Sequence, residues 1–200
     1  MRVEVAKTAG FCFGVDRAVS TVYKLLEEGK QAATLGPIIH NPQVTGDLAA
    51  RGVVTVSRPQ ETPAGYTLVI RSHGVAQAVE EEIQALGLPY VDATCPFVAK
   101  IHRLARRAGE EGRTLLVAGD ENHPEVQGIA SWCRDARIFG NAEEVAKWAE
   151  ETAEIADLPI TMVAQTTCIR ALWESCVKFL KKECTNLKID DTICNCLLYT

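Results

Sequence analysis

The chain has 200 residues, and 47% of them are hydrophobic, which is enough to bury the core of one ordinary domain or two small ones. Its formal net charge of -5 and its scattered basic residues argue against general binding to nucleic acid or to anionic membranes. No apolar signal-peptide region opens the chain and no stretch is long enough to span a membrane, so we expect a cytoplasmic protein.

Two stretches of the chain begin with the same predicted element, a cysteine followed by an amphipathic helix. Apolar residues recur at helical spacing over residues 15–26, after Cys12, and over residues 98–108, after Cys95. In the reducing cytoplasm these thiols are poor candidates for disulfides. Because the same pattern begins at two distant points, it indicates a repeated unit.

The second element of each stretch is a short apolar strand that ends in a polar turn with a His and a Pro. The strand over residues 32–35 leads to His40, and the strand over residues 114–118 leads to His123. The residue Glu125 lies two positions after His123. Each turn therefore carries a side chain that is able to exchange a proton or bind an anion.

The third element is another apolar strand with polar residues at its end. Residues 67–70 lead into His73, and residues 160–164 lead into Thr166. Both stretches then run through a helix and a short strand into an Asp-x-x-Cys motif, which ends at Cys95 and at Cys194.

Alternating strands and helices predict an α/β fold with parallel-rich sheets, in which the polar residues gather at the carboxyl ends of the strands. We expect four segments: an N-terminal strand with the first cysteine over residues 1–13, a first α/β lobe over 14–96, a second over 97–193, and the start of a third over 194–200. No Gly/Ser-rich linker marks either of the last two boundaries.

The thiols of Cys12, Cys95 and Cys194 are candidates for one shared metal site, because thiolate sulfur is a soft ligand for iron or zinc. Their spacings of 83 and 99 residues match no local zinc motif, so burial as small hydrophobic residues is the alternative. Burial is the interpretation we favour for four other cysteines, Cys133, Cys168, Cys176 and Cys184.

Three of the four histidines stand beside Pro or Gly in strand-to-helix turns. Converging imidazoles can donate hydrogen bonds to phosphate oxygens, so His40, His73 and His123 are candidate ligands of a diphosphate. The fourth, His102, lies within a predicted helix, and we interpret it as a surface or capping residue.

Two further residue types suit proton transfer and hydroxyl binding. A carboxyl group near a desolvated site can deliver protons, which makes Glu125 a candidate general acid. Thr166 or Thr167 could hydrogen-bond a substrate hydroxyl, although threonines at strand ends are usually caps.

Seven motifs in the same order resemble the family of 4-hydroxy-3-methylbut-2-enyl diphosphate reductases, which complete the non-mevalonate pathway of isoprene biosynthesis. The resemblance covers nearly the whole chain and rests on Gly10–Val15, Ile39–Pro42, Ser72–Val75, Asp92–Pro96, His123–Gly128, Gln165–Thr167 and Asp191–Cys194.

The resemblance implies three α/β lobes with pseudo-threefold symmetry around a central [4Fe-4S] cluster, bound by Cys12, Cys95 and Cys194. It implies that His40 and His73 hold the substrate diphosphate, that His123 lies near the diphosphate and the hydroxyl, that Glu125 is catalytic and supplies protons, and that Thr166 contacts the hydroxyl. The implied reaction is an iron-dependent reductive dehydroxylation that forms isopentenyl and dimethylallyl diphosphate.

The implied partners are a small allylic diphosphate and an external electron donor such as a ferredoxin or flavodoxin, since the sequence has no Gly-x-Gly-x-x-Gly signature. The resemblance stops after Cys194, where residues 195–200 depart from the family pattern and most of the third lobe is missing. An inactive or cluster-binding fragment is therefore an alternative, and a zinc-dependent hydrolase is a weaker one.

Overall fold

A computed structural model describes Glu4 and residues 9–196, which form two compact units. The first unit holds the described residues up to Gly74, with Glu82–Pro96 and Cys194–Cys196, and the second holds Val75–Glu81 and Phe97–Ile193. The strand expected within residues 1–13 lies largely outside the described residues. Every helix of the described ranges is too short or too polar to cross a membrane.

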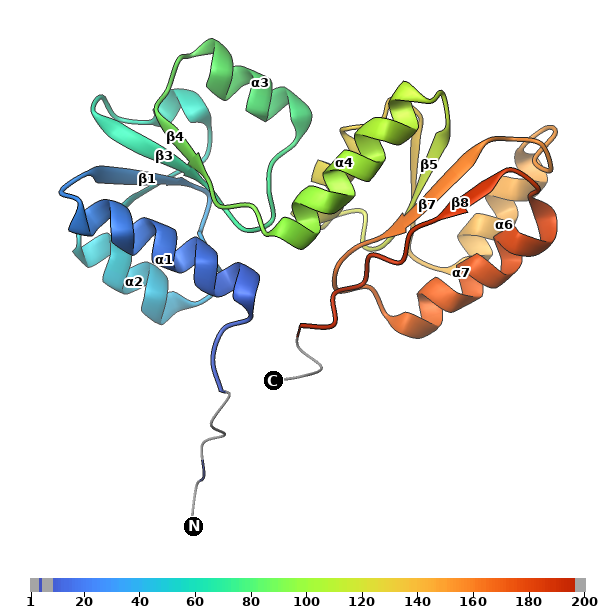
Figure 1. The fold of residues 1–200 in the computed structure, drawn as a ribbon, viewed down its shortest axis with the longest axis horizontal. Helices are drawn as coiled ribbons and strands as arrows, with labels where there is room; N and C mark the ends of the chain where they lie inside the picture. Colours follow the sequence, from blue (N-terminus) through green and yellow to red (C-terminus); the bar gives the residue numbers. More distant parts are fainter. Residues whose placement is uncertain (1–3, 5–8, 197–200) are drawn as a thin grey trace. The chain divides into compact units, whose positions relative to one another are not determined.

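The first unit is built on a four-stranded parallel sheet with the order β2-β1-β3-β4 (Figure 1). Helices α1 and α2 pack on one face of this sheet, and α3 covers the other. The strands are β1 (Gln31–Leu35), β2 (Val54–Val56), β3 (Tyr66–Ile70) and β4 (Tyr90–Asp92), and the helices are α1 (Phe13–Glu27), α2 (Pro42–Ala50) and the short 3-10 helix η1 (Pro59–Glu61). Helix α3 (Gln77–Ala85) belongs to this unit from Glu82 onward.

The second unit repeats this arrangement with a parallel sheet of order β6-β5-β7-β8. The identical strand order confirms the repeat and the α/β fold expected from the sequence. The strands are β5 (Thr114–Ala118), β6 (Ala136–Phe139), β7 (Ile160–Ala164) and β8 (Leu187–Ile189), and the helices are α4 (Pro96–Glu110), α5 (Pro124–Ala130), α6 (Ala142–Glu151) and α7 (Arg170–Glu183).

Strand β5 shows why the sequences of the central strands are continuously apolar. Every residue from Thr114 to Ala118 is buried, because helices cover both faces of the sheet. Leu115 and Val117 pack with α4 and α5, whereas Leu116 and Ala118 pack with α6 and α7. The alternation of side chains along a strand thus divides the core into two layers.

The edge strands β2 and β6 were missed by the sequence analysis. Both are short, and Val54 and Thr55 of β2 are exposed, so neither strand carries a continuous apolar run. Strand β2 forms because its residues pair with Ala33–Leu35 of the central strand β1. This is a tertiary contact that local periodicity does not report.

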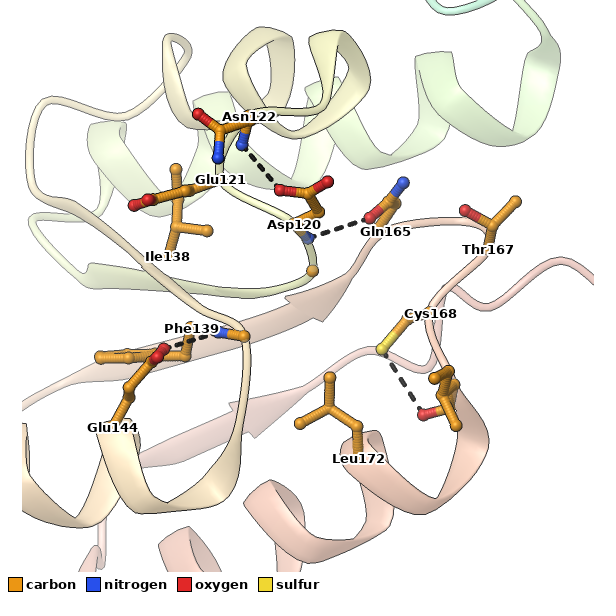
Figure 2. A pocket seen from close by; sticks show the side chains of 13 residues that line it. Asp120, Glu121, Asn122, Ile138, Phe139, Glu144, Gln165, Thr167, Cys168 and Leu172 are labelled. Carbon is orange, nitrogen blue, oxygen red and sulfur yellow. Dashed lines mark hydrogen bonds between the residues drawn. The ribbon is translucent and has the colours of Figure 1, made fainter.

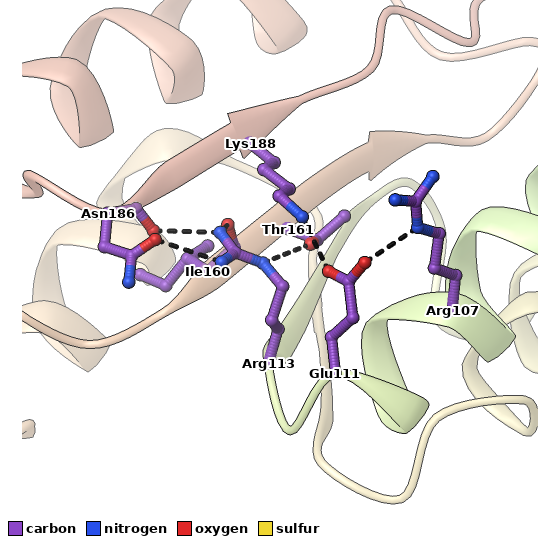
Figure 3. Close-up of polar contacts among 7 residues, drawn as sticks. All are labelled: Arg107, Glu111, Arg113, Ile160, Thr161, Asn186 and Lys188. Atoms are coloured by element: carbon purple, nitrogen blue, oxygen red, sulfur yellow. Dashed lines mark hydrogen bonds and ion pairs between the residues drawn. The ribbon is translucent and has the colours of Figure 1, made fainter.

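The two edges of the second sheet differ in character. At the carboxyl ends of β5, β6 and β7 lies an open cavity of about 710 Å³ (Figure 2). At the amino ends, the buried guanidinium of Arg113 donates to Thr161 Oγ1 at 2.9 Å and to Asn186 Oδ1 at 3.0 Å (Figure 3). It also donates to the carbonyl oxygens of Asn186 and Ile160. The Arg113 side chain therefore links the amino ends of β5 and β7 to Asn186, the residue before β8.

Replacing this side chain is expected to destabilise the second unit. Arg113→Met would leave several buried acceptors without a donor, which predicts a free energy of unfolding lower by about 3 kcal/mol. Urea denaturation measures the change, and Arg134→Met, at an exposed arginine, is the matched control. Equal stability of the two variants would contradict the role assigned to Arg113.

A second polar cluster at this edge lies at the surface (Figure 3). Hydrogen bonds from Lys188 and then Arg107 lower the pKa of Glu111 to about 2. A lowered pKa stabilises the folded chain above the ordinary carboxyl pKa, and the gain disappears as the pH falls towards 2. Because these groups are exposed, we expect the contribution to be small.

Candidate active site

Each sheet has a point where the chain leaves neighbouring strands towards opposite faces. In the first unit α2 follows β1 and α3 follows β3, and these helices cover opposite faces of the sheet. In the second unit α5 follows β5 and α7 follows β7, again on opposite faces. In open α/β sheets, ligands bind in the crevice at this switch point. We therefore expect ligands to bind at the carboxyl ends of β1 and β3 and of β5 and β7.

The β1/β3 switch point brings together two of the predicted histidines. His40 precedes α2 and His73 follows β3, and their ring centroids lie 5.8 Å apart. The side chain of Asn41 accepts hydrogen bonds from the N–H groups of Gln43 and Val44, which caps α2 and holds the His40 turn. The tertiary fold thus pairs two imidazoles that lie 33 residues apart in the sequence.

The β5/β7 switch point brings together Glu125 and Thr166. The Thr166 N–H donates to one Glu125 carboxylate oxygen at 2.6 Å, and the Thr166 hydroxyl donates to the other at 2.8 Å. Glu125 is only 2% exposed, so its carboxyl group is almost completely removed from water. His123 caps α5, because its Nδ1 accepts the Glu125 N–H at 3.1 Å. The roles assigned to these residues stay predictions.

The Asp-x-x-Cys motifs form the same local turn in both repeats. The Asp92 carboxylate accepts the Thr94 N–H at 2.8 Å, and the Asp191 carboxylate accepts the Ile193 N–H at 3.3 Å. Such a turn, in which an Asp side chain accepts an N–H two residues later, sets the direction of the chain as it enters the cysteine. The motif therefore has a structural reason in addition to its cysteine.

Cys95 is held by contacts from two other parts of the first unit. Its N–H donates to the Ser72 carbonyl at 2.9 Å, which joins it to the turn that carries His73. Arg17 of α1 donates to the Thr94 carbonyl at 2.9 Å. The sequence analysis missed Arg17, because an arginine on the polar side of a predicted amphipathic helix does not indicate a contact with a distant carbonyl group.

Cys95 lies against the first turn of α1, next to Gly14. Cys12 is the N-cap residue of α1, and Gly14 follows two positions later. A Cβ atom added to Gly14 would lie 2.4 Å from Cys95 Sγ, so any larger residue would displace that thiol. The absence of a side chain at position 14 therefore leaves space for Cys95 at the first turn of α1.

Cys194 contacts a further thiol, that of Cys196. The Cys196 N–H donates to Cys194 Sγ at 3.4 Å. The pKa of the Cys196 thiol is raised to about 11, first by its hydrogen bond to Cys194, then by burial and by the charges of Cys194, Cys12 and Cys95. Within the described ranges, no group of three His, Cys, Asp or Glu side chains has a geometry that could hold a metal ion. The shared metal site therefore stays a prediction.

The remaining four cysteines are buried, as the sequence analysis predicted: Cys133, Cys168, Cys176 and Cys184. Cys176 is fully buried in the core layer of α6 and α7, and burial raises the pKa of its thiol to about 11. This residue is a packing element of the second unit.

The raised pKa of the Cys176 thiol predicts that the folded chain loses stability at alkaline pH. A raised pKa favours the neutral thiol in the folded chain, so its stabilisation is complete below the unfolded thiol pKa of about 8.5 and is lost as the pH rises through about 11. Burial also raises the pKa of the Cys133, Cys168 and Cys184 thiols, so urea unfolding between these pH values, under reducing conditions, is expected to show a loss that is smaller by on the order of 2 kcal/mol in Cys176→Ala than in the parent chain. Ser175→Ala, at the exposed neighbour, is expected to keep the slope of the parent chain.

His102 differs from the expected surface or capping residue. It is half-buried in α4, and its ring centroid lies 5.8 Å from that of the buried Trp132. Arg106 covers the same Trp132 ring at 4.2 Å. The prediction was wrong because the segment after α5 packs on this face of α4, which the helical pattern alone does not reveal.

The cavity at the second sheet is lined by Gln165 and Thr167, the two neighbours of Thr166 in the sequence (Figure 2). Asp120 and Gln165 meet at its wall, where the Asp120 N–H donates to Gln165 Oε1 at 3.2 Å. Gly119 permits this contact, since an added Cβ would lie 2.8 Å from Gln165. Of the site residues predicted from the sequence, Thr167, the alternative to Thr166, lines this cavity, whereas the other eight do not.

Comparisons with known sequences agree on one family. The profile described as LytB protein matches residues 3–197. Two curated relatives named 4-hydroxy-3-methylbut-2-enyl diphosphate reductase are 38% identical, from Thermoanaerobacter sp. (strain X514), and 42% identical, from Desulfovibrio desulfuricans. Each alignment covers 98% of this chain and 67% or 70% of the relative, so the chain spans about two thirds of their length.

Two solved structures have the same fold over most of this chain. One, described as (E)-4-hydroxy-3-methyl-but-2-enyl diphosphate reductase, the terminal enzyme of the non-mevalonate pathway, gives a TM-score of 0.82 at 35% identity, over 97% of this chain and 68% of its own. The other, the E-1-hydroxy-2-methyl-but-2-enyl-4-diphosphate reductase from Plasmodium falciparum, gives 0.85 at 26% identity, over 94% of this chain and 59% of its own.

Proposed function

This chain belongs to the LytB protein family, and from that membership we propose that it carries out the reductive dehydroxylation of (E)-4-hydroxy-3-methylbut-2-enyl diphosphate. Two electrons and two protons would replace the C–O bond with a C–H bond and release water, with isopentenyl and dimethylallyl diphosphate as products. The observation that best supports the proposal is the buried Glu125 carboxylate, which Thr166 holds at the β5/β7 switch point.

In this proposal Cys12, Cys95 and Cys194 would hold an iron-sulfur cluster, on the chemistry of their thiols and not on a preformed geometry in the described residues. Thiolates are the usual ligands of such clusters, and the helix N-terminus at Cys12 favours negative charge. Gly14 leaves the space that a Cβ would take from Cys95 Sγ. A bound [4Fe-4S] cluster with three cysteine ligands supplies electrons and one iron with an open position that acts as a Lewis acid.

Proton delivery falls to Glu125 in this proposal. Its two oxygens face two Thr166 donors, so Thr166 fixes the orientation of the carboxyl group. Burial limits its exchange of protons with bulk water, which suits an acid that must protonate a substrate and not the solvent. In this proposal Thr166 would also contact the substrate hydroxyl, together with His123, the N-cap residue of α5.

In this proposal His40 and His73 bind the diphosphate group. Their rings lie 5.8 Å apart, which is close enough for both to reach oxygens of one diphosphate. Electrons would come from an external carrier such as a ferredoxin or flavodoxin in the cytoplasm. The second candidate is an inactive or cluster-binding fragment of the family, which the assay below separates from the reductase.

Anaerobic reconstitution separates these two candidates and the zinc-dependent hydrolase. The 200-residue chain is loaded with iron and sulfide, its metal and sulfide contents are measured, and turnover of the hydroxy-diphosphate is assayed with a chemically reduced dye. Turnover at a measurable rate supports the reductase. Iron and sulfide without turnover support the cluster-binding fragment, and zinc without iron or sulfide supports the zinc-dependent hydrolase.

A further inference from the structure

Arg71 stands at the β1/β3 switch point, although neither the sequence motifs nor the comparisons assign it a role. It follows Ile70, the last residue of β3, and Ile70 pairs with Leu35 at the end of β1. The Arg71 carbonyl accepts the Gly74 N–H at 3.0 Å, which closes the turn that carries His73. Arg71 therefore belongs to the same turn as a predicted diphosphate ligand.

The Arg71 side chain is half-buried, and its guanidinium has no partner among the described residues. Its Nε atom is buried without a hydrogen bond, and no carboxylate of the described ranges forms an ion pair with it. Burial alone lowers the pKa of Arg71, and no neighbouring charge offsets this effect. Because a desolvated cation normally has a compensating acceptor, its absence among the described residues points to an acceptor outside them, such as a bound anion.

Arg113 provides the contrast within the same protein. Its guanidinium is also buried, but Thr161, Asn186 and Ile160 supply four acceptor oxygens. A buried arginine with a structural role in this protein thus has acceptors for its N–H groups. Arg71 has no such acceptors among the described residues.

Gly36 leaves the space that the Arg71 guanidinium occupies. It follows β1 and adopts a positive φ of 72°, which favours glycine. A Cβ added at Gly36 would lie 2.9 Å from Nη1 and 3.4 Å from Cζ of Arg71. The guanidinium thus lies over the end of β1, at the beginning of the segment that leads to His40.

We propose that Arg71 is an anion-binding residue that takes a phosphate group in the β1/β3 crevice, beside the His40–His73 pair. The inference rests on the proposed function, because it adds a third ligand to the diphosphate subsite. A guanidinium suits this task, since its planar N–H groups form paired hydrogen bonds to phosphate oxygens and it stays charged at every physiological pH. The two imidazoles then orient the second phosphate group.

Binding of inorganic pyrophosphate to the 200-residue chain tests the proposal without any turnover. Titration calorimetry is expected to show a dissociation constant raised about 10-fold to 100-fold in Arg71→Gln, the range that the loss of a charge-assisted hydrogen bond predicts. Arg71→Lys is expected to bind with intermediate affinity because it keeps the charge but not the paired donors. Arg58→Gln, at an exposed arginine of the same unit, is the matched control and is expected to bind as the parent chain does.

Thermal unfolding of each variant shows whether it is folded, and pyrophosphate is expected to raise the melting temperature of the parent more than that of Arg71→Gln. A folded Arg71→Gln that binds within twofold of the parent would overturn the proposal, as would a parent chain that does not bind pyrophosphate. If His40→Asn and His73→Asn lose binding while Arg71→Gln keeps it, only the role of Arg71 fails. If none of the three changes binding, the diphosphate subsite of the proposed function fails as well.

Discussion

After anaerobic reconstitution, Cys12→Ser, Cys95→Ser and Cys194→Ser are each expected to retain less than about one tenth of the iron and sulfide of the parent chain. Loss of even an outer-shell partner typically weakens metal binding 10-fold to 100-fold, and loss of a thiolate ligand is more severe. Visible absorption and chemical assays of iron and sulfide measure the result. No turnover is needed, so the test also covers a chain that binds a cluster without catalysing a reaction.

Cys184→Ala is the matched control for these variants. Cys184 is a buried thiol of the second unit that packs in the core layer of α6 and α7. It is expected to keep the iron and sulfide content of the parent. If Cys184→Ala lost iron as fully as Cys95→Ser, the loss would reflect damage to the fold, and the three-cysteine assignment would be unsupported.

Glu125→Gln is expected to lower the turnover of the reconstituted chain about 10²-fold to 10⁴-fold, the usual effect of removing a general acid. The amide has nearly the shape of the carboxylate and keeps one acceptor for Thr166, so the fold and the cluster content are expected to stay unchanged. Turnover and iron content measured on the same sample separate a lost proton donor from a lost cluster.

Two further variants sharpen this test. Thr166→Val removes the hydroxyl donor to Glu125 Oε2 while keeping the backbone N–H donor, so a smaller loss of turnover is expected. Glu150→Gln, at an exposed position of α6, is expected to leave turnover unchanged. Turnover of Glu125→Gln equal to that of Glu150→Gln would remove Glu125 from the mechanism.

The sequence predicted much of the fold because the signals of the repeated unit are local. The apolar runs 114–118 and 160–164 correspond to β5 and β7, and the helical spacing after Cys12 and Cys95 corresponds to α1 and α4. Both central strands are buried on both faces, which makes their sequences continuously apolar.

The candidate site was only partly accessible to the same reasoning. Motif order picked out Glu125 and Thr166, but the hydrogen bonds between them depend on the pairing of β5 with β7. Arg17 and Arg71 carried no signal, because an arginine is common in helices and turns. Their roles appear only where Arg17 donates to the Thr94 carbonyl and where Arg71 has no acceptor among the described residues.

The sequence by itself determined the repeated α/β unit, the burial of four cysteines and the polar residues that follow each strand. These properties depend on residue type and on periodicity over a few neighbouring positions. Only the tertiary structure decided the strand order, the pairing of His40 with His73, the packing of His102 against Trp132 and the lack of an acceptor for the Arg71 guanidinium among the described residues. Each of these depends on contacts between residues distant in sequence, and strand register and helix packing fix such contacts.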